Sequence, residues 1–239
     1  LGTNIIKSGA GVKTIVTDNL VLRHNYALSP VQPLSDGAAF FDGDTDYIEL
    51  GSQSGDLRLS GSNGAVVSWI NPILTGDEYK RIVDKSDGGN GANGYALFVK
   101  NDGTVQGNID GVAQVVTSSG VVVTSEWQHL VWTWDGTTHY IYVNGIEVQS
   151  NSSSTTPPSD TMNMRIGTWN HDTEREYKGY MCNVGIFEEA LTQPQIKSIM
   201  NKNYAGLTSS EKEDLVSWWN LDSVIPDTTT LVYDNHHGD

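Results

Sequence analysis

Residues 126–148 read EWQHLVWTWDGTTHYIYVNGIEV, and this stretch decides the fold class. Aromatic and β-branched residues, which favour β-strands, fill it on both sides of Asp135-Gly136. This dipeptide and Asn144-Gly145 are strong signals for tight hairpin turns. Two consecutive aromatic-rich hairpins predict an antiparallel sheet.

Similar short apolar runs recur from Ala38 to Phe187, separated by turn signals such as Asp42-Gly43 and Asn71-Pro72. Their spacing of roughly 8–12 residues is typical of β-sandwiches, in which two sheets bury their apolar faces against each other. The sequence therefore predicts an all-β, two-sheet antiparallel jelly-roll sandwich with one or two short helices near the C-terminus. We expect the core to include or border the following apolar residues: Leu97, Val99, Leu130, Val131, Trp132, Ile141, Val143, Ile186 and Phe187.

The charge and composition of the chain limit the classes of molecule that it can bind. The chain of 239 residues carries a formal net charge of −15, which disfavours nucleic acid and anionic membrane surfaces but is compatible with neutral sugars and divalent cations. No apolar run approaches the roughly 20 residues of a membrane span, so we expect no membrane insertion. Cys182 is the only cysteine, so stability must come from the core or from bound metal.

The order of several motifs resembles a known family. These motifs are F-D-G-x-x-D-Y-I-E-L at Phe41–Leu50, S-W-I-N-P at Ser68–Pro72, the W-D-G and Y-V-N-G hairpin, and the strand and helix at Lys178–Thr192. Together they resemble the laminin-G-like or pentraxin-like domains of the concanavalin A-like lectin/glucanase superfamily. The resemblance spans about Phe40 to Met200. Cys182-Asn183 stand where that family usually has an Asp-Glu pair.

The resemblance divides the chain into three parts. We expect an N-terminal extension or first strand over residues 1–37, the jelly roll over 38–205, and a C-terminal extension over 206–239 that resembles the start of another such domain. A capping box at Thr192 and Gln195 predicts a short helix, and a second helical turn is expected from Ser210. The strand-like segment Leu215–Trp219 is too apolar for a solvated terminus. It either completes its own sandwich, adds to a neighbouring copy to form a homo-oligomer or repeating assembly, or begins another domain.

A calcium site follows from the resemblance. It places the pentraxin calcium loop on Asn170, His171 and Asp172, and a contributing loop near Asp84 and Asp87. Calcium takes oxygen ligands from carboxylates, carbonyls and water, so the expected metal ligands are Asp84, Asp87, Asn170 and Asp172. The alternative is that these Asx-Gly loops are acidic only because their turns require such residues.

Sugar binding would use an exposed aromatic ring together with planar polar groups. Trp169, His171 and Tyr177 lie in the same predicted loop as the metal ligands and are the expected ligand-binding residues. For Trp169 the alternative is packing at the edge of the core. Trp127, Trp132 and Trp134 are expected to fill the core.

Three functions fit this pattern. The first is a non-catalytic carbohydrate-binding or adhesion module, with or without assistance by Ca2+, in an extracellular, cell-surface or virion protein whose partner is a glycan or glycoprotein. The second is a structural or assembly domain of a viral or surface filament. The third is a polysaccharide hydrolase or lyase, but no strand carries the E-x-D-x-x-E pattern that places catalytic carboxylates on one sheet face. We therefore expect no enzymatic activity.

Overall fold

The computed structural model describes residues 4–8, 11–15, 31–51, 56–59, 61–76, 78–87, 92–158, 162–169 and 175–222. The chain divides into two compact units, Leu1–Pro30 and Val31–Asp239. In the first unit, β1 (Asn4–Ser8) and β2 (Gly11–Ile15) form an antiparallel hairpin in which Asn4 pairs with Ile15.

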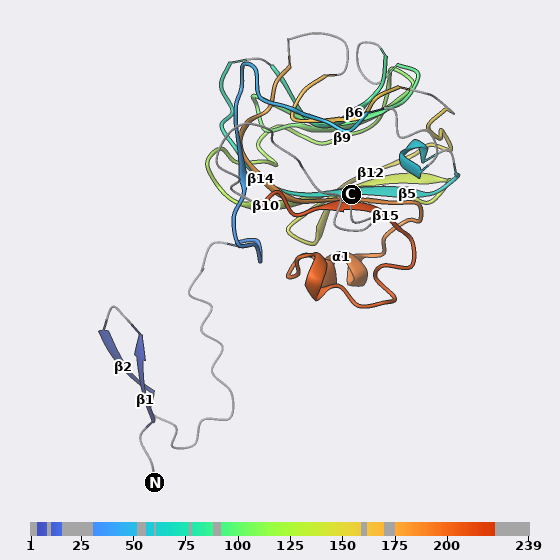
Figure 1. Cartoon of the computed structure of the whole chain (residues 1–239). Coiled ribbons are helices and arrows are strands. Elements are labelled where there is room, and N and C mark those ends of the chain that lie inside the picture. Colours follow the sequence, from blue (N-terminus) through green and yellow to red (C-terminus); the bar gives the residue numbers. More distant parts are fainter. Residues whose placement is uncertain are drawn as a thin grey trace. The chain divides into compact units, whose positions relative to one another are not determined.

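The second unit contains two antiparallel sheets packed face to face (Figure 1). One sheet has seven strands in the order β12-β11-β10-β5-β14-β15, with β3 also paired to β14. The other has six strands in the order β4-β13-β6-β7-β8-β9. The strands are β3 (Ala39–Asp42), β4 (Ile48–Glu49), β5 (Gly64–Pro72), β6 (Tyr79–Lys85), β7 (Tyr95–Lys100), β8 (Val105–Ile109), β9 (Val112–Val116), β10 (Gln128–Trp134), β11 (Thr138–Val143), β12 (Ile146–Ser152), β13 (Arg165–Ile166), β14 (Lys178–Phe187) and β15 (Leu215–Trp219). The chain is thus the predicted all-β two-sheet sandwich.

The main core lies between the two sheets. Strand residues alternate between sheet faces, and on β10 this alternation turns Leu130, Trp132 and Trp134 toward the opposite sheet. The indoles of Trp132 and Trp134 lie 4.8 Å apart between ring centroids and are fully buried. Burying about 150–250 Å² per indole, at about 25 cal/mol per Å², contributes roughly 4–6 kcal/mol each. All nine residues expected in or beside the core are buried.

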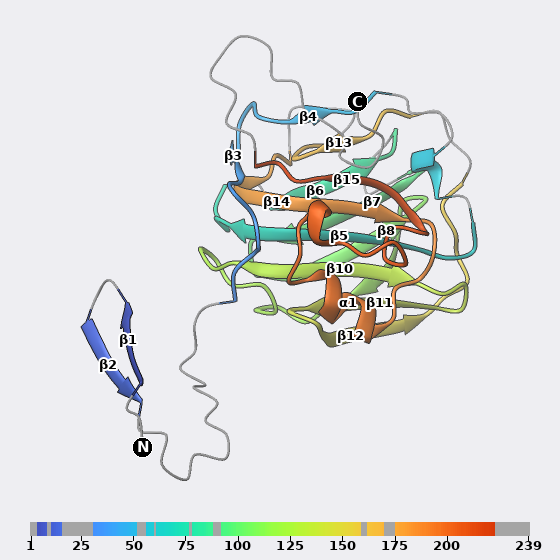
Figure 2. The ribbon, with the colours of Figure 1, turned by 60° about the horizontal axis from the view of Figure 1, so that its bottom comes forward.

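A second apolar cluster covers the other face of the seven-stranded sheet. Val131 and Phe187 belong to this cluster, together with Ile196 and Ile199 of α1 (Gln193–Ile199). The helix lies on the side of this sheet away from the six-stranded sheet (Figures 1 and 2). It begins at the predicted capping box, in which the Thr192 backbone N–H donates to Gln195 Oε1 at 2.8 Å.

The expected second helical turn at Ser210 does not form; residues 209–214 form turns and a bend. The capping interaction uses the neighbouring pair Thr208 and Glu211, in which the Thr208 N–H donates to Glu211 Oε2 at 2.8 Å. A 3-10 turn, η2 (Tyr204–Gly206), precedes it, and η1 (Asp56–Arg58) lies near the start of the sandwich. Among the described helices, none is long and apolar enough to cross a membrane.

The C-terminal strand completes its own sandwich. β15 pairs antiparallel with the second half of β14, with Val184 opposite Trp219. Trp218 packs into the outer cluster and Trp219 into the core between the sheets. This confirms the first of the arrangements expected for Leu215–Trp219. The domain boundaries expected at residues 37 and 205 stay predictions.

A candidate ligand-binding surface on the six-stranded sheet

The loop expected to bind ligand and metal is only partly described. Asn170, His171 and Asp172 lie outside the described residues, whereas Trp169, Tyr177 and the two aspartates of the β6 loop lie within them. The surroundings of each described residue decide which of them remain candidates.

Tyr177 does not fit a sugar-stacking role, because its ring is fully buried. It packs edge-on against Phe41, with 5.8 Å between ring centroids, and its hydroxyl donates to the Tyr180 carbonyl at 3.0 Å. Burial also raises the pKa of this phenol. The side chain is therefore part of the core, and its sequence neighbours made it look like a loop residue.

Asp84 is also buried and is engaged by protein groups. Its Oδ1 accepts a hydrogen bond from Ser86 Oγ at 2.6 Å, and its Oδ2 lies 3.2 Å from Arg81 Nε. Burial raises the pKa of Asp84 to about 6, and the Arg81 charge offsets this only in part. The Arg81 guanidinium therefore lies beside Asp84 where a calcium ion bound to this carboxylate would lie.

Asp87 belongs to the turn after β6. Its Oδ1 accepts a hydrogen bond from Asn93 Nδ2 at 2.7 Å. In the described part of the chain, no group of three or more His, Cys, Asp or Glu side chains is placed to hold a metal ion. Because Asn170 and Asp172 lie outside the described residues, the expected calcium site stays a prediction.

Trp169 lies at a different kind of site, on the outer face of the six-stranded sheet. On β7, Leu97 and Val99 face the core, so alternation turns Phe98 and Lys100 to this outer face. Across the β6–β7 pair, Arg81 is opposite Phe98 and Tyr79 is opposite Lys100. The outer face of these two strands therefore carries two aromatic rings and two cations.

These groups stack on one another. Arg81 Cζ lies 4.1 Å from the Phe98 ring centroid, and Lys100 Nζ lies 5.1 Å from that of Tyr79. The rings of Tyr79 and Phe98 meet edge to face at 5.6 Å. Arg81 is fully buried, and its burial lowers its pKa to about 10, so that it stays charged at neutral pH.

Arg175 joins this stack from the loop that follows Trp169. Its Cζ lies 4.2 Å from the Trp169 ring centroid and 5.2 Å from that of Tyr79. The Arg175 carbonyl accepts a hydrogen bond from the Arg81 N–H at 3.2 Å, which fixes the loop to β6. Arg175 has a φ of 85°, in the left-handed region that long side chains rarely adopt.

The surface gathers several cationic side chains, three of which lie beside a carboxylate: Asp84 beside Arg81, Glu78 beside Lys100 and Glu49 beside Arg165. It carries four of the 14 Lys and Arg residues, namely Arg81, Lys100, Arg165 and Arg175, whereas the whole chain has a net charge of −15. Arg165 pairs with Glu49, with 2.7 Å between Nε and Oε2, and its Nη1 donates to the Trp169 carbonyl at 3.1 Å. The site residues predicted from the sequence did not include Tyr79, Arg81, Lys100 or Arg175. The alternation of Phe98 and Lys100 with Leu97 and Val99 could have identified the outer face.

Comparisons with known proteins agree with this architecture. The family model Laminin_G_3, described as concanavalin A-like lectin/glucanases superfamily, matches residues 42–197. A search of curated protein sequences finds no significant match.

Among solved structures, a candidate carbohydrate-binding protein from Bacteroides ovatus ATCC 8483 is similar with a TM-score of 0.59 and 22% identity. The match covers 83% of this chain and 55% of that chain, so this chain spans about half the length of that relative. Domain 4 of AbnA, a GH43 extracellular arabinanase from Geobacillus stearothermophilus in complex with arabinotriose, has a TM-score of 0.53 and 18% identity over 69% of this chain and 76% of that chain. The CBM40 of Ruminococcus gnavus IT-sialidase has a TM-score of 0.56 and 14% identity over 70% of this chain and 97% of that chain.

At these identities the solved structures establish the fold alone: a concanavalin A-like domain that resembles carbohydrate-binding modules. The family match covers well over half of the sequence. The chain therefore belongs to the Laminin_G_3 family of the concanavalin A-like lectin/glucanase superfamily.

Proposed function

We propose that this domain is a non-catalytic carbohydrate-binding module that holds a glycan on the outer face of the six-stranded sheet. The observation that carries the proposal is the partly exposed stack of Trp169, Arg175 and Tyr79. An aromatic face packs against the apolar face of a sugar ring, and a guanidinium donates hydrogen bonds in one plane to sugar oxygens. The partner is then a glycan or a glycoprotein.

The backbone of Arg175 supports a ligand role over a purely structural one. A non-glycine residue in the left-handed region costs of order 1–3 kcal/mol, and such residues cluster at binding sites. If Arg175 only held the loop closed, a residue with an unstrained backbone could serve as well. The strain is offset by the two ring contacts of the guanidinium, which hold it at the surface between Trp169 and Tyr79.

The setting we propose is extracellular or at a cell surface. The solved relative from G. stearothermophilus is described as a domain of an extracellular enzyme, and carbohydrate-binding domains of such proteins meet their ligands outside the cell. The alternative of a repeating assembly through the C-terminal strand is not favoured by any observation, because β15 pairs within its own sheet. Hydrolysis is not favoured either, since no stretch of the sequence carries the E-x-D-x-x-E pattern of paired catalytic carboxylates.

The test is a glycan array probed with the wild-type chain, Trp169→Ala and Arg175→Ala, each with added calcium and with chelator. We expect each substitution to weaken binding by about tenfold or more, which corresponds to at least about 1.4 kcal/mol. Binding is expected in both conditions, because Asp84 and Asp87 are engaged by protein groups.

The matched control is a second cation–aromatic pair elsewhere on the domain. Lys212 Nζ lies 3.8 Å from the Tyr204 ring centroid, in the segment beside α1. Tyr204→Ala and Lys212→Ala should leave the glycan signal unchanged. Equal losses in these controls and in Trp169→Ala, or an array without any signal, would contradict the proposed function.

A further inference from the structure

The outer face of the seven-stranded sheet carries its side chains in rows two residues apart along each strand. Across β10, β5 and β14, the first row contains Val131, Val67 and Gly185, and the next pair along, Ala65 and Phe187, lies beside it. The side chains of Val131, Val67, Ala65 and Phe187 lie in the cluster beneath α1. This row is therefore covered by the helix.

The second row is covered by other parts of the chain. It contains His129, Trp69 and Cys182, all of which are buried. Trp69 Nε1 donates to the Met200 carbonyl at 3.0 Å, so the segment after α1 lies over this row. The Leu34 carbonyl accepts from Asn183 Nδ2 at 3.0 Å, which holds the segment before β3 at the neighbouring position of β14.

The third row is the one that the described residues leave partly exposed. It runs from Trp127, next to the first residue of β10, through Asn71 of β5 and Tyr180 of β14 to Phe40 of β3. Phe40 is 48% exposed and Tyr180 45% exposed, and Trp127 and Asn71 are partly exposed. Ring centroids lie 4.9 Å apart for Phe40 and Tyr180 and 6.5 Å apart for Trp127 and Tyr180. Three aromatic rings and one amide thus form a continuous strip across four strands.

We propose that this strip is a second carbohydrate-binding site, which takes a single neutral glycan chain lying across the strands. The ring spacings are comparable with the length of one pyranose residue, so successive sugars can meet successive rings. The Asn71 amide, at the centre of the strip, offers both a donor and an acceptor to sugar hydroxyls. The proposal shares its ligand class with the proposed function but rests on other residues and on the other sheet.

Charge and area select a neutral glycan over other occupants. The four residues of the strip are uncharged and the chain has a net charge of −15, so an anionic polymer would be repelled. Three partly exposed rings offer roughly 300 Å² of contact. A stable protein interface buries about 800 Å² per partner, so the strip is too small for a second copy of the chain.

The inclination of the rings selects a single chain over a crystalline surface. Tyr180 is inclined by 56° to Phe40 and by 45° to Trp127. Rings inclined to this extent cannot lie together against one flat crystal face. A twisted, soluble chain can follow them.

The experiment is affinity electrophoresis of the full chain in gels containing soluble hydroxyethyl cellulose, xylan, arabinan or galactomannan. At least one polysaccharide should retard the wild-type chain, and Tyr180→Ala and Phe40→Ala should each weaken that retardation by about tenfold in dissociation constant. Tyr180→Phe keeps the ring and should retain binding. Val112→Ala, which removes a 61% exposed side chain from the other sheet, should migrate as the wild type does.

The outcomes separate the two sites. If Tyr180→Ala is retarded as strongly as the wild type in every gel, or if no polysaccharide retards the wild type, the second site is wrong. If Trp169→Ala alone loses glycan binding, the proposed function stands and the second site is overturned. If sedimentation shows a wild-type dimer that Tyr180→Ala dissociates, the strip is a contact between copies. Binding to microcrystalline cellulose would overturn the assignment to a single chain.

Discussion

Gly107 on β8 faces the indole of Trp132 on β10 so closely that a Cβ atom at this position would lie 2.5 Å from Trp132 Cε2. The contact joins the two sheets, because β8 belongs to the six-stranded sheet and β10 to the seven-stranded one. The position of this core tryptophan therefore depends on the absence of a side chain opposite it.

The first prediction follows from this contact. Gly107→Ala should lower the free energy of unfolding by about 1–3 kcal/mol, since overpacking forces neighbouring side chains out of their preferred rotamers. Urea unfolding followed by tryptophan fluorescence measures the change. Gly61→Ala is the matched control, because a Cβ there would meet no atom closer than 3.9 Å. Equal stability of the two variants would contradict the prediction.

The second prediction concerns the C-terminal strand. Trp218→Ala and Trp219→Ala should each lower the free energy of unfolding by about 3–5 kcal/mol, since each leaves a large cavity. The two indoles lie on opposite faces of the sheet and are 1% and 2% exposed. Thermal unfolding of both variants should be compared with that of Tyr47→Ala, in which the lost ring is 49% exposed. A melting temperature near that of Tyr47→Ala would show that β15 contributes little.

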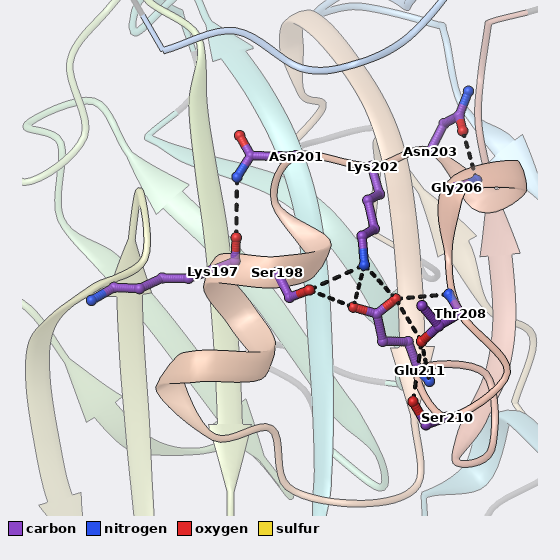
Figure 3. A network of polar contacts seen from close by, with 9 residues as sticks. All are labelled: Lys197, Ser198, Asn201, Lys202, Asn203, Gly206, Thr208, Ser210 and Glu211. Atoms are coloured by element: carbon purple, nitrogen blue, oxygen red, sulfur yellow. Dashed lines mark hydrogen bonds and ion pairs between the residues drawn. The ribbon is translucent and has the colours of Figure 1, made fainter. Parts of the chain in front are cut away.

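The third prediction concerns the network that ties α1 to the segment before β15 (Figure 3). Glu211 accepts hydrogen bonds from Lys202 Nζ at 2.6 Å, from Ser198 Oγ at 2.6 Å and from the Thr208 N–H at 2.8 Å. Burial alone would raise the pKa of Glu211, but the hydrogen bonds from Lys202, Ser198 and Thr208 together lower it to about 2.

Glu211→Gln should therefore lower the free energy of unfolding at neutral pH by about 1–2 kcal/mol. Because the folded-state pKa is depressed, the stabilisation by the carboxylate is present above pH 4.5 and is lost as the pH falls toward 2. The difference between the wild type and the variant should shrink over that window in urea titrations. Glu213→Gln, an exposed acid two residues away, should show neither effect.

The fourth prediction is the acid sensitivity introduced by His129. This side chain is 1% exposed beside Trp69, and burial lowers its pKa to about 3 from 6.5. Below pH 6.5 the unfolded chain therefore binds a proton at His129 that the folded chain does not bind. The free energy of unfolding falls as the pH is lowered from 6.5 toward 3.

His129→Leu removes the titrating group and should make the domain less sensitive to acid. Between about pH 6.5 and pH 5, the wild type should lose roughly 1.4 kcal/mol per pH unit relative to the variant. Guanidinium unfolding at several pH values gives the two slopes. Parallel slopes would mean that His129 is protonated in the folded chain.

The sequence was a good guide to the sandwich and a poor one to the surface. Period-2 alternation and paired turn signals led to the strands around Trp132 and Trp134, and both indoles lie in the core as expected. The capping box at Thr192 was equally readable because it is a local interaction. These features depend on neighbours within a few residues.

Trp127 is one residue whose burial the local sequence pattern did not predict correctly. It was expected in the core with Trp132 and Trp134, but it differs from them in parity along the strand and lies partly exposed on the outer face. Tyr177 and Asp84 were likewise expected in a ligand site, yet one packs on Phe41 and the other pairs with Arg81. Such burial depends on segments far apart in the chain, which the spacing of residues does not reveal.

The pairing of β14 with two segments that are distant in sequence affects the order of folding during synthesis. β3 (Ala39–Asp42) pairs with the first half of this strand and β15 (Leu215–Trp219) with the second half, so one strand is flanked by segments from both ends of the sandwich. Non-local pairings of this kind slow folding, because a long loop must close first. Until Trp219 leaves the ribosome, half of β14 presents unpaired amides and carbonyls that invite aggregation. A nascent chain stalled before Leu215 therefore keeps this half of β14 unpaired and should depend on chaperones.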